Sequence, residues 1–150
     1  MSYATIADMY ARYNRDALHI LTLNKVPDRQ SLSPEALVQA QEQLIQVALD
    51  DAAAMIDGYI DGRATLPLEK VPVVLVRTAC VLARFSLEEG QATDKAAKDA
   101  EGAVRLLEKV AAGEVGLGLS KDAERPAGGD VAVITSQGSV WSRNKSRGFI

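Results

Sequence analysis

The chain has 150 residues, 47% of them hydrophobic but only 5% aromatic, and a formal net charge of −3. The length suits one domain, and a core built from aliphatic side chains favours close-packed helices over a β-sandwich. The negative charge argues against a protein that binds nucleic acid through its overall charge, and the single cysteine, Cys80, excludes an internal disulfide and a cysteine-rich metal site.

Two short helical segments are predicted at the N-terminal end. Thr5, with Asp8 three residues later, forms the capping pattern of a helix that runs to about Tyr13. Asp16 is the expected cap of a second short turn that extends through Leu23.

A long helix is predicted from Pro34 to about Gly62. Ser33 stands at the N-cap position, and Pro34 at the first helical position is a strong start signal. The apolar residues recur at steps of three and four, which predicts one buried stripe along the helix. The stripe consists of Leu37, Val38, Leu44, Ile45, Ala48, Leu49, Ala52, Met55, Ile56, Tyr59 and Ile60.

The most apolar helix is expected next, from Pro72 to about Glu89, after a loop at residues 62–71. It is apolar nearly all round, which is typical of a helix in the middle of a bundle. We expect Leu82 to be buried there and Cys80 to be a buried, unreactive thiol.

A last helix is predicted from about Asp94 to Ala112, with Gly113 as its C-terminal stop. Its predicted inner stripe consists of Ala97, Ala100, Val104, Leu107 and Ala111. The sequence therefore predicts an all-α bundle of about four helices in residues 1–113. Residues 114–150 are punctuated by glycine and proline and are expected to form an extended C-terminal arm.

The arm differs from the bundle in its charge and pattern. Residues 131–135 and 139–142 could form a small β-hairpin, although a lone hairpin of this size is marginal in water. From Val131 onward the arm has basic residues and no acidic ones, whereas residues 1–62 are acidic. We expect the arm to become ordered on a partner; disorder in the isolated subunit and packing on its own bundle stay open as alternatives. Its candidate contact residues are Trp141, Arg143, Lys145, Arg147 and Phe149.

Four charged residues of the helices are further candidates for interaction. Arg77 and Arg84 lie seven residues apart on the most apolar helix, and Arg84 can pair with Glu88 one turn later. Asp57 and Asp61 share a face of the long helix. Pairing of these arginines with these aspartates within one subunit, pairing between subunits of a ring, and contact with DNA all remain open.

Residues that could carry catalysis are sparse. The only histidine, His19, lies between apolar neighbours and is expected to be a partly buried or surface residue with a structural role. We find no catalytic constellation, no cofactor motif and no metal-ligand cluster, so the sequence predicts a protein that is not an enzyme and needs no cofactor or metal.

The start of the chain lacks the pattern of a signal peptide. Residues 71–87, the most apolar stretch, contain Pro72, Arg77 and Arg84 and are too short and too charged to span a membrane comfortably. A soluble, cytoplasmic product without a membrane partner is therefore expected.

The central part of the chain contains a series of short motifs in a specific order and spacing. They are Ile56-Asp57-Gly58-Tyr59-Ile60, Gly62-Arg63, Leu66-Pro67-Leu68, Val71-Pro72, Leu75, Ala79-Cys80 and Ala83-Arg84. The series continues with Gly113-Glu114-Val115, Leu117-Gly118-Leu119 and Arg147-Gly148-Phe149. Together these motifs resemble the Mu-like prophage family of small head-to-tail joining proteins.

The resemblance implies a connector subunit in the virion, assembled in the cytoplasm of the bacterial host. Copies would form a twelvefold ring below the portal protein, contact tail-side joining proteins and prolong the channel through which DNA passes without sequence-specific contact. Some relatives carry an acidic, calcium-loop-like stretch, but residues 24–29 have too few carboxylates here, so no calcium is expected.

The central motif also has a physical interpretation of its own. Gly58 within a helix costs about 1 kcal/mol relative to alanine, and a close approach of another helix would compensate for it. Gly62 can end the long helix, and the prolines of the following loop stiffen the turn into the next helix.

The alternative function is a helical nucleic-acid-binding or regulatory adaptor of a prophage. Such a protein needs a basic recognition helix, but each predicted helix mixes both charges. Binding of the purified chain to short duplex DNA at moderate salt would favour this alternative.

Overall fold

The computed structural model describes residues 2–88 and 90–119, which form five α-helices and no strand. The prediction of an all-α bundle is confirmed for this part of the chain. The expected number of about four helices is corrected to five, because the second short segment completes a helix of its own. The helices are α1 (Ile6–Arg12), α2 (Arg15–Leu23), α3 (Pro34–Ile60), α4 (Val73–Glu88) and α5 (Asp94–Ala111).

Local capping explains where the two N-terminal helices begin. The Thr5 hydroxyl accepts from the Asp8 amide at 3.2 Å, and the Asp8 carboxylate accepts from the Thr5 amide at 2.9 Å, so the predicted cap is a reciprocal capping box. The predicted cap of α2 is wrong. Asn14 caps that helix by accepting from the amides of Asp16 and Ala17, which places Asp16 in the first turn.

Helix α3 begins as predicted, because the Ser33 hydroxyl accepts from the Ala36 amide and Pro34 opens the helix. The expected role of Gly58 is wrong: a Cβ atom there would meet nothing within 4 Å, so none of the described helices approaches closely. Gly113 does act as a stop after α5, since its φ of 78° is the left-handed conformation that glycine adopts readily.

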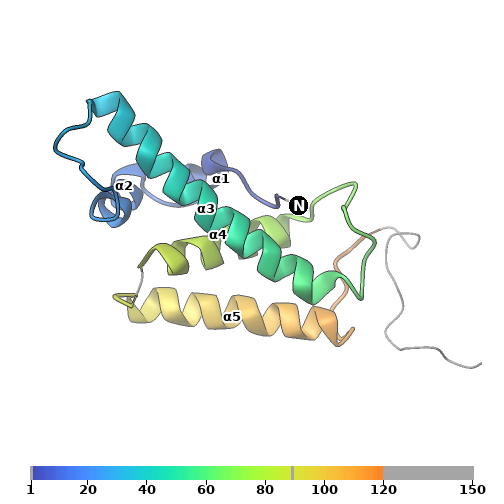
Figure 1. The fold of residues 1–150 in the computed structure, drawn as a ribbon. Helices are drawn as coiled ribbons and strands as arrows, with labels where there is room; N and C mark the ends of the chain where they lie inside the picture. The colour runs from blue at the N-terminus through green and yellow to red at the C-terminus, as the bar shows by residue number, and fades with distance from the viewer. Residues whose placement is uncertain (1, 89, 120–150) are drawn as a thin grey trace, which may run out of the picture.

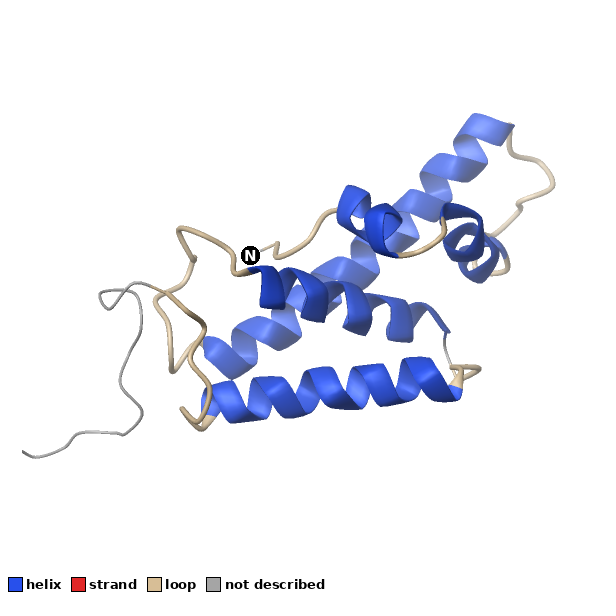
Figure 2. Ribbon diagram, turned by 180° about the vertical axis from the view of Figure 1, so that it is seen from behind, coloured by secondary structure: helices blue, strands red, loops and turns tan. Residues whose placement is uncertain are grey.

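The two longest apolar segments form the centre of the bundle. Helix α4 contacts all four other helices, and α3 packs along it (Figure 1). Helix α5 lies along one side of this pair, and the short helices α1 and α2 cover the other side (Figure 2). The prediction of α4 as the central helix is therefore confirmed.

The core includes much of the predicted stripes, but the predicted stripe of α5 is wrong at Ala97 and Ala111, which are exposed, whereas Ala96, Ala103 and Val110 are buried. Ile56, Ile60, Leu75 and Leu107 are completely buried, and Leu82 and Cys80 are buried as well. Burial raises the pKa of the Cys80 thiol to about 11, so little of it is thiolate at neutral pH, as expected for an unreactive cysteine.

Helix α4 is covered on several sides, as expected, but it is exposed at two places. Val73 is 76% exposed and Val74 is also exposed in the first turn, which precedes the part of the helix packed on its neighbours. Phe85 is 40% exposed near the other end. The protein therefore displays apolar side chains of its most apolar helix.

The chain after α5 returns to the bundle. Leu117 is buried, and Val115 and Leu119 pack against the core. The first part of the predicted arm thus lies on the bundle. The predicted strands at residues 131–135 and 139–142 lie outside the described residues, as do Trp141, Arg143, Lys145, Arg147 and Phe149.

Candidate interaction surface

Arg84 is held within its own subunit. Its Nε atom lies 3.0 Å from the Glu88 carboxylate one turn later, so the predicted pair of these residues is confirmed. The guanidinium also lies over the ring of Tyr13, 4.8 Å from its centre. These contacts join α4 to the N-terminal segment, and they replace the pairing with Asp57 or Asp61 that the sequence left open for Arg84.

Glu88 is the buried member of this pair. While one carboxylate oxygen accepts from Arg84, the other accepts from the Thr93 amide at 2.9 Å. Thr93 is the N-cap of α5. One buried carboxylate therefore stabilises the turn between α4 and α5.

We expect Glu88→Gln to lower the free energy of unfolding by about 1–3 kcal/mol, because a buried acceptor of two hydrogen bonds becomes an amide that cannot replace both with equal strength. Glu101→Gln is the matched control, since Glu101 forms an exposed pair with Arg105 at the same helical spacing and should lose less than about 0.5 kcal/mol. Urea denaturation measures both. Equal losses would contradict the assigned role of Glu88.

Arg77, unlike Arg84, remains available for contact with another subunit. It is exposed, and it has no hydrogen bond or ion pair with any residue of the described part of the chain. Its predicted pairing with another subunit remains a prediction.

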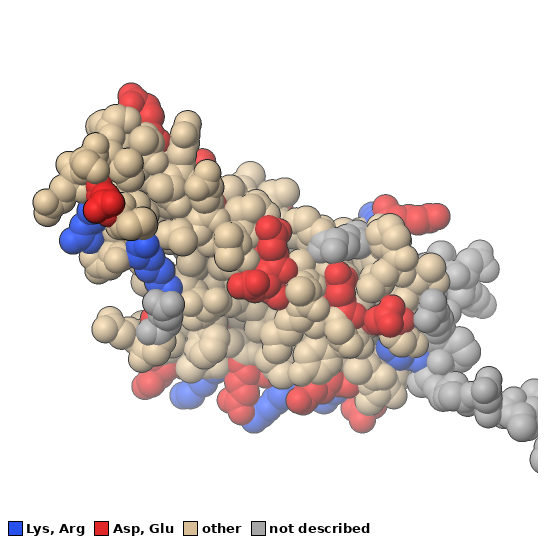
Figure 3. Space-filling view, in the orientation of Figure 1, with Lys and Arg blue, Asp and Glu red and all other residues tan. Residues whose placement is uncertain are grey.

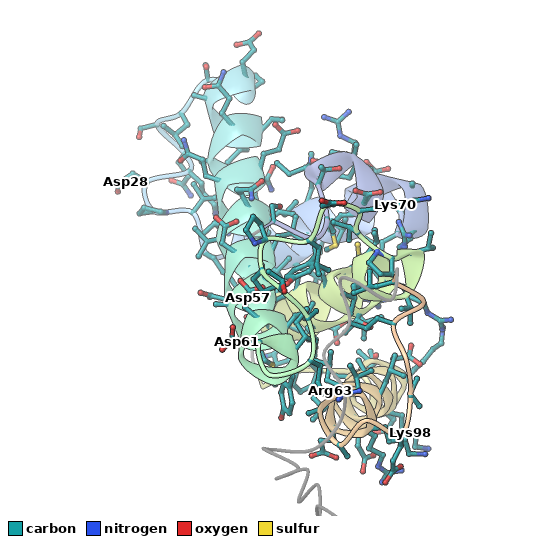
Figure 4. The ribbon with its side chains drawn as sticks, turned by 90° about the vertical axis from the view of Figure 1, so that its right-hand side faces the viewer. Asp28, Asp57, Asp61, Arg63, Lys70 and Lys98 are labelled. Carbon is teal, nitrogen blue, oxygen red and sulfur yellow. The ribbon has the colours of Figure 1, made fainter. Side chains whose placement is uncertain are left out.

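Asp57 and Asp61 lie at the C-terminal end of α3, on one side of the helix (Figure 4). Asp57 is half-buried and accepts a short hydrogen bond from the Tyr3 hydroxyl. Burial of Tyr3, together with this hydrogen bond, raises the pKa of the phenol well above its usual range. Asp57 therefore anchors the N-terminal segment to α3.

Arg63 follows the end of α3 and lies toward α5 (Figure 4). Its Nε and Nη1 atoms are buried without a hydrogen-bond partner among the described residues. Buried donors without a partner are rare because each costs free energy. Sequence reasoning gave Arg63 no role, since burial of a loop arginine has no local signal; the structure adds it to the candidate interaction residues.

The only histidine belongs to a polar cluster that joins α1, α2 and α3. The Tyr10 hydroxyl donates to Glu42 at 3.1 Å and lies 3.0 Å from His19 Nε2, which then acts as a donor. The Arg15 guanidinium lies over the Tyr10 ring and 3.6 Å from the Glu42 carboxylate. The buried Gln41 donates to the His19 carbonyl at 2.7 Å. His19 is half-buried, as expected, and holds the short helices on α3.

A groove opens between α3 and α5, with α4 as its floor. Its volume is about 530 Å³, and most of its surface is apolar. Met55 and Phe85 stand at its sides, and each is 40% exposed. The groove is lined chiefly by Ala52, Met55, Leu82, Phe85, Ala100 and Val104.

Sequence reasoning assigned these groove residues to the core. Met55 belongs to the predicted stripe of α3, and Ala100 and Val104 belong to the stripe of α5. The sequence did contain an indication of the groove. Ala52 and Ala100 line it from the two helices and are too small to fill the space between them. Whether such a gap is closed depends on the distance between the helices, which the sequence does not state.

Among the helices of the described residues, none has the length and apolar character needed to cross a membrane. Within the same residues, no three side chains among His, Cys, Asp and Glu come together as they would around a metal ion.

Comparison with known proteins identifies related phage proteins. Residues 3–135 match the model of the family described as Bacteriophage Mu, Gp36. The chain is 46% identical over 137 residues to the Mu-like prophage FluMu protein gp36 of Haemophilus influenzae, covering 91% of this chain and 96% of that protein. It is 42% identical over 151 residues to gene product J of Escherichia phage Mu, covering both chains completely.

Proposed function

The chain belongs to the Bacteriophage Mu Gp36 family, and on that premise we propose that it is a structural subunit of the junction between phage head and tail. Copies form a ring below the portal protein, and the ring offers a surface to the tail-side joining proteins. The resemblance to the family implies that this ring is twelvefold. The proposal agrees with phage and prophage relatives that match nearly the whole chain.

The observation that carries the proposal is the apolar surface of a stable helical body. Met55 and Phe85 are exposed although the helices share a buried core, and both line a groove whose surface is mostly apolar. Apolar patches of this kind commonly mark sites of protein association. A subunit with a buried core and exposed apolar side chains is suited to assembly with other protein subunits.

The charge of the chain agrees with a channel through which DNA slides. A net charge of −3 gives the subunit no overall attraction for phosphates. In this proposal, DNA passes through the ring without sequence-specific contact, and the protein is a virion component that is not an enzyme.

Deletion of the gene from the phage or prophage genome that encodes it tests the proposal. We expect filled heads and complete tails that fail to join, visible by electron microscopy, with infectivity restored by the wild-type chain in trans. Normal joined particles, or a block before DNA packaging, would refute the proposal. Tight binding of the purified chain to duplex DNA at moderate salt would instead favour a nucleic-acid-binding adaptor.

A further inference from the structure

We propose that the groove between α3 and α5 binds the C-terminal segment, residues 131–150, of a neighbouring copy of this chain, with Trp141 as the apolar anchor. This inference deepens the proposed function, because it assigns the contact that links one subunit of the ring to the next. Four properties of the molecule support it: the shape of the groove, its exposed apolar side chains, its charge, and the place where the described chain ends.

The groove exists because small side chains face each other across it. Ala48 and Ala52 line it from α3, and Ala97 and Ala100 line it from α5. At about 530 Å³ the groove falls within the range of roughly 300–1,000 Å³ that is common for pockets that bury a ligand of moderate size. It can therefore receive a large aromatic side chain together with its neighbours.

The sides of the groove are apolar and accessible to solvent. Met55 from α3 and Phe85 from α4 line the groove and are partly exposed. Methionine and aromatic side chains adapt well to an aromatic partner. The segment 131–150 contains Trp141, the only tryptophan of the chain.

The charges of groove and segment are complementary. Asp51 and Glu101 line the groove from opposite helices, and Asp51 has no ion pair within the described residues. Figure 3 shows acidic side chains over the middle of α3 with no basic side chain beside them. The segment has Arg143, Lys145 and Arg147 and no acidic residue. Such complementarity steers association and fixes its orientation.

The described chain continues past the C-terminal end of α5, whereas the groove is lined mainly by the N-terminal half of this helix. The groove residues of α4 and α5 lie toward the turn between these helices, and the described chain that follows α5 lies on the other side of the bundle (Figure 1). From residue 120 to Trp141 an extended chain can reach roughly 70 Å, and α5 is only about 27 Å long. The groove lies toward the α4–α5 turn, and the C-terminal segment follows the opposite end of α5. Binding of this segment in the groove of a neighbour is therefore a head-to-tail interface, the type that closes into rings.

A disulfide experiment on the full-length chain tests which subunit supplies the segment. The double variant Ala97→Cys/Ser142→Cys places one thiol in the groove and one beside Trp141, and Ile20→Cys/Ser142→Cys is the control on exposed α2. The native Cys80 is buried with a raised pKa, so it should not compete. Under mild oxidation we expect a ladder of linked subunits on a non-reducing denaturing gel for the groove variant, and none for the control.

Each other result of this experiment overturns the inference. A disulfide within one chain would show that the segment occupies its own groove. Equal ladders from both variants would show that contact with the groove is not specific. Assembled rings without linkage at Ala97 would show that another surface binds the segment. In that last case the proposed function survives, because head-to-tail joining is tested separately by the gene deletion.

Fluorescence of Trp141 gives a second test, since it reports on this segment alone. As the concentration of the full-length chain rises and subunits associate, we expect its emission maximum to shift to shorter wavelength. Phe85→Ser should abolish the shift and weaken self-association by about tenfold or more, as is common when an aromatic anchor site is lost. Val73→Ser, an apolar-to-serine change at an exposed site of the same helix, should keep the shift. An unaltered shift in Phe85→Ser would refute the inference.

Discussion

Replacing Ile56 by alanine is expected to lower the free energy of unfolding by about 2–5 kcal/mol. Ile56 is completely buried near the C-terminal end of α3, the helix that packs on α4. The alanine would lose the burial of the removed carbons and would leave a cavity that close-packed helices cannot fully close. Leu82→Ala, on the facing helix, should have an effect in the same range because Leu82 is also buried.

Met55→Ala is the matched control for this prediction. Met55 precedes Ile56 on the same helix and is similar in size, but it is 40% exposed. Its loss should therefore cost less than about 1 kcal/mol. Denaturation in urea with a circular dichroism signal measures all three variants. Costs below about 0.5 kcal/mol at both Ile56 and Leu82 would mean that the faces of the helices are misassigned.

Deletion of residues 131–150 is expected to abolish ring formation and attachment to heads while the helical content and Tm of the subunit stay nearly unchanged. Within residues 2–88 and 90–119, which the structure describes, the five helices already bury a common core, so we expect the bundle to fold without this segment. The segment carries Trp141 and the basic residues that complement the acidic body. Trp141→Ala should weaken assembly markedly in the full-length chain.

The melting curve and the sedimentation profile of the truncated protein separate this mechanism from a simpler one. If the segment packed on its own bundle as ordinary structure, the truncated subunit would melt several degrees lower. High salt should slow assembly of the full-length chain more than it reverses it, because screening acts mainly on the encounter. Truncated subunits that still join heads to tails would exclude the segment from the mechanism.

Local interactions made much of the fold predictable from sequence. The caps at Thr5 and Ser33 depend on residues within one turn, so a sequence pattern identifies them directly. The buried stripes of α3 and α5 follow from helical periodicity, and the pair Arg84–Glu88 follows from a spacing of four residues. In each of these cases the geometry of a single helix decides which residues share a face or lie within contact distance.

Other features depend on how the helices approach one another, and the sequence by itself did not determine them. Ile56 and Met55 both belong to the predicted stripe, yet one is buried and the other stands beside a groove, because the alanines of α3 and α5 leave the gap between these helices unfilled. Gly58 faces open space where a close approach was expected. The buried Glu88 acquires its second partner only when the turn brings Thr93 to it. Periodicity gives the direction of a side chain from its own helix axis, whereas burial depends on the distance to the next helix, which only the tertiary structure decided.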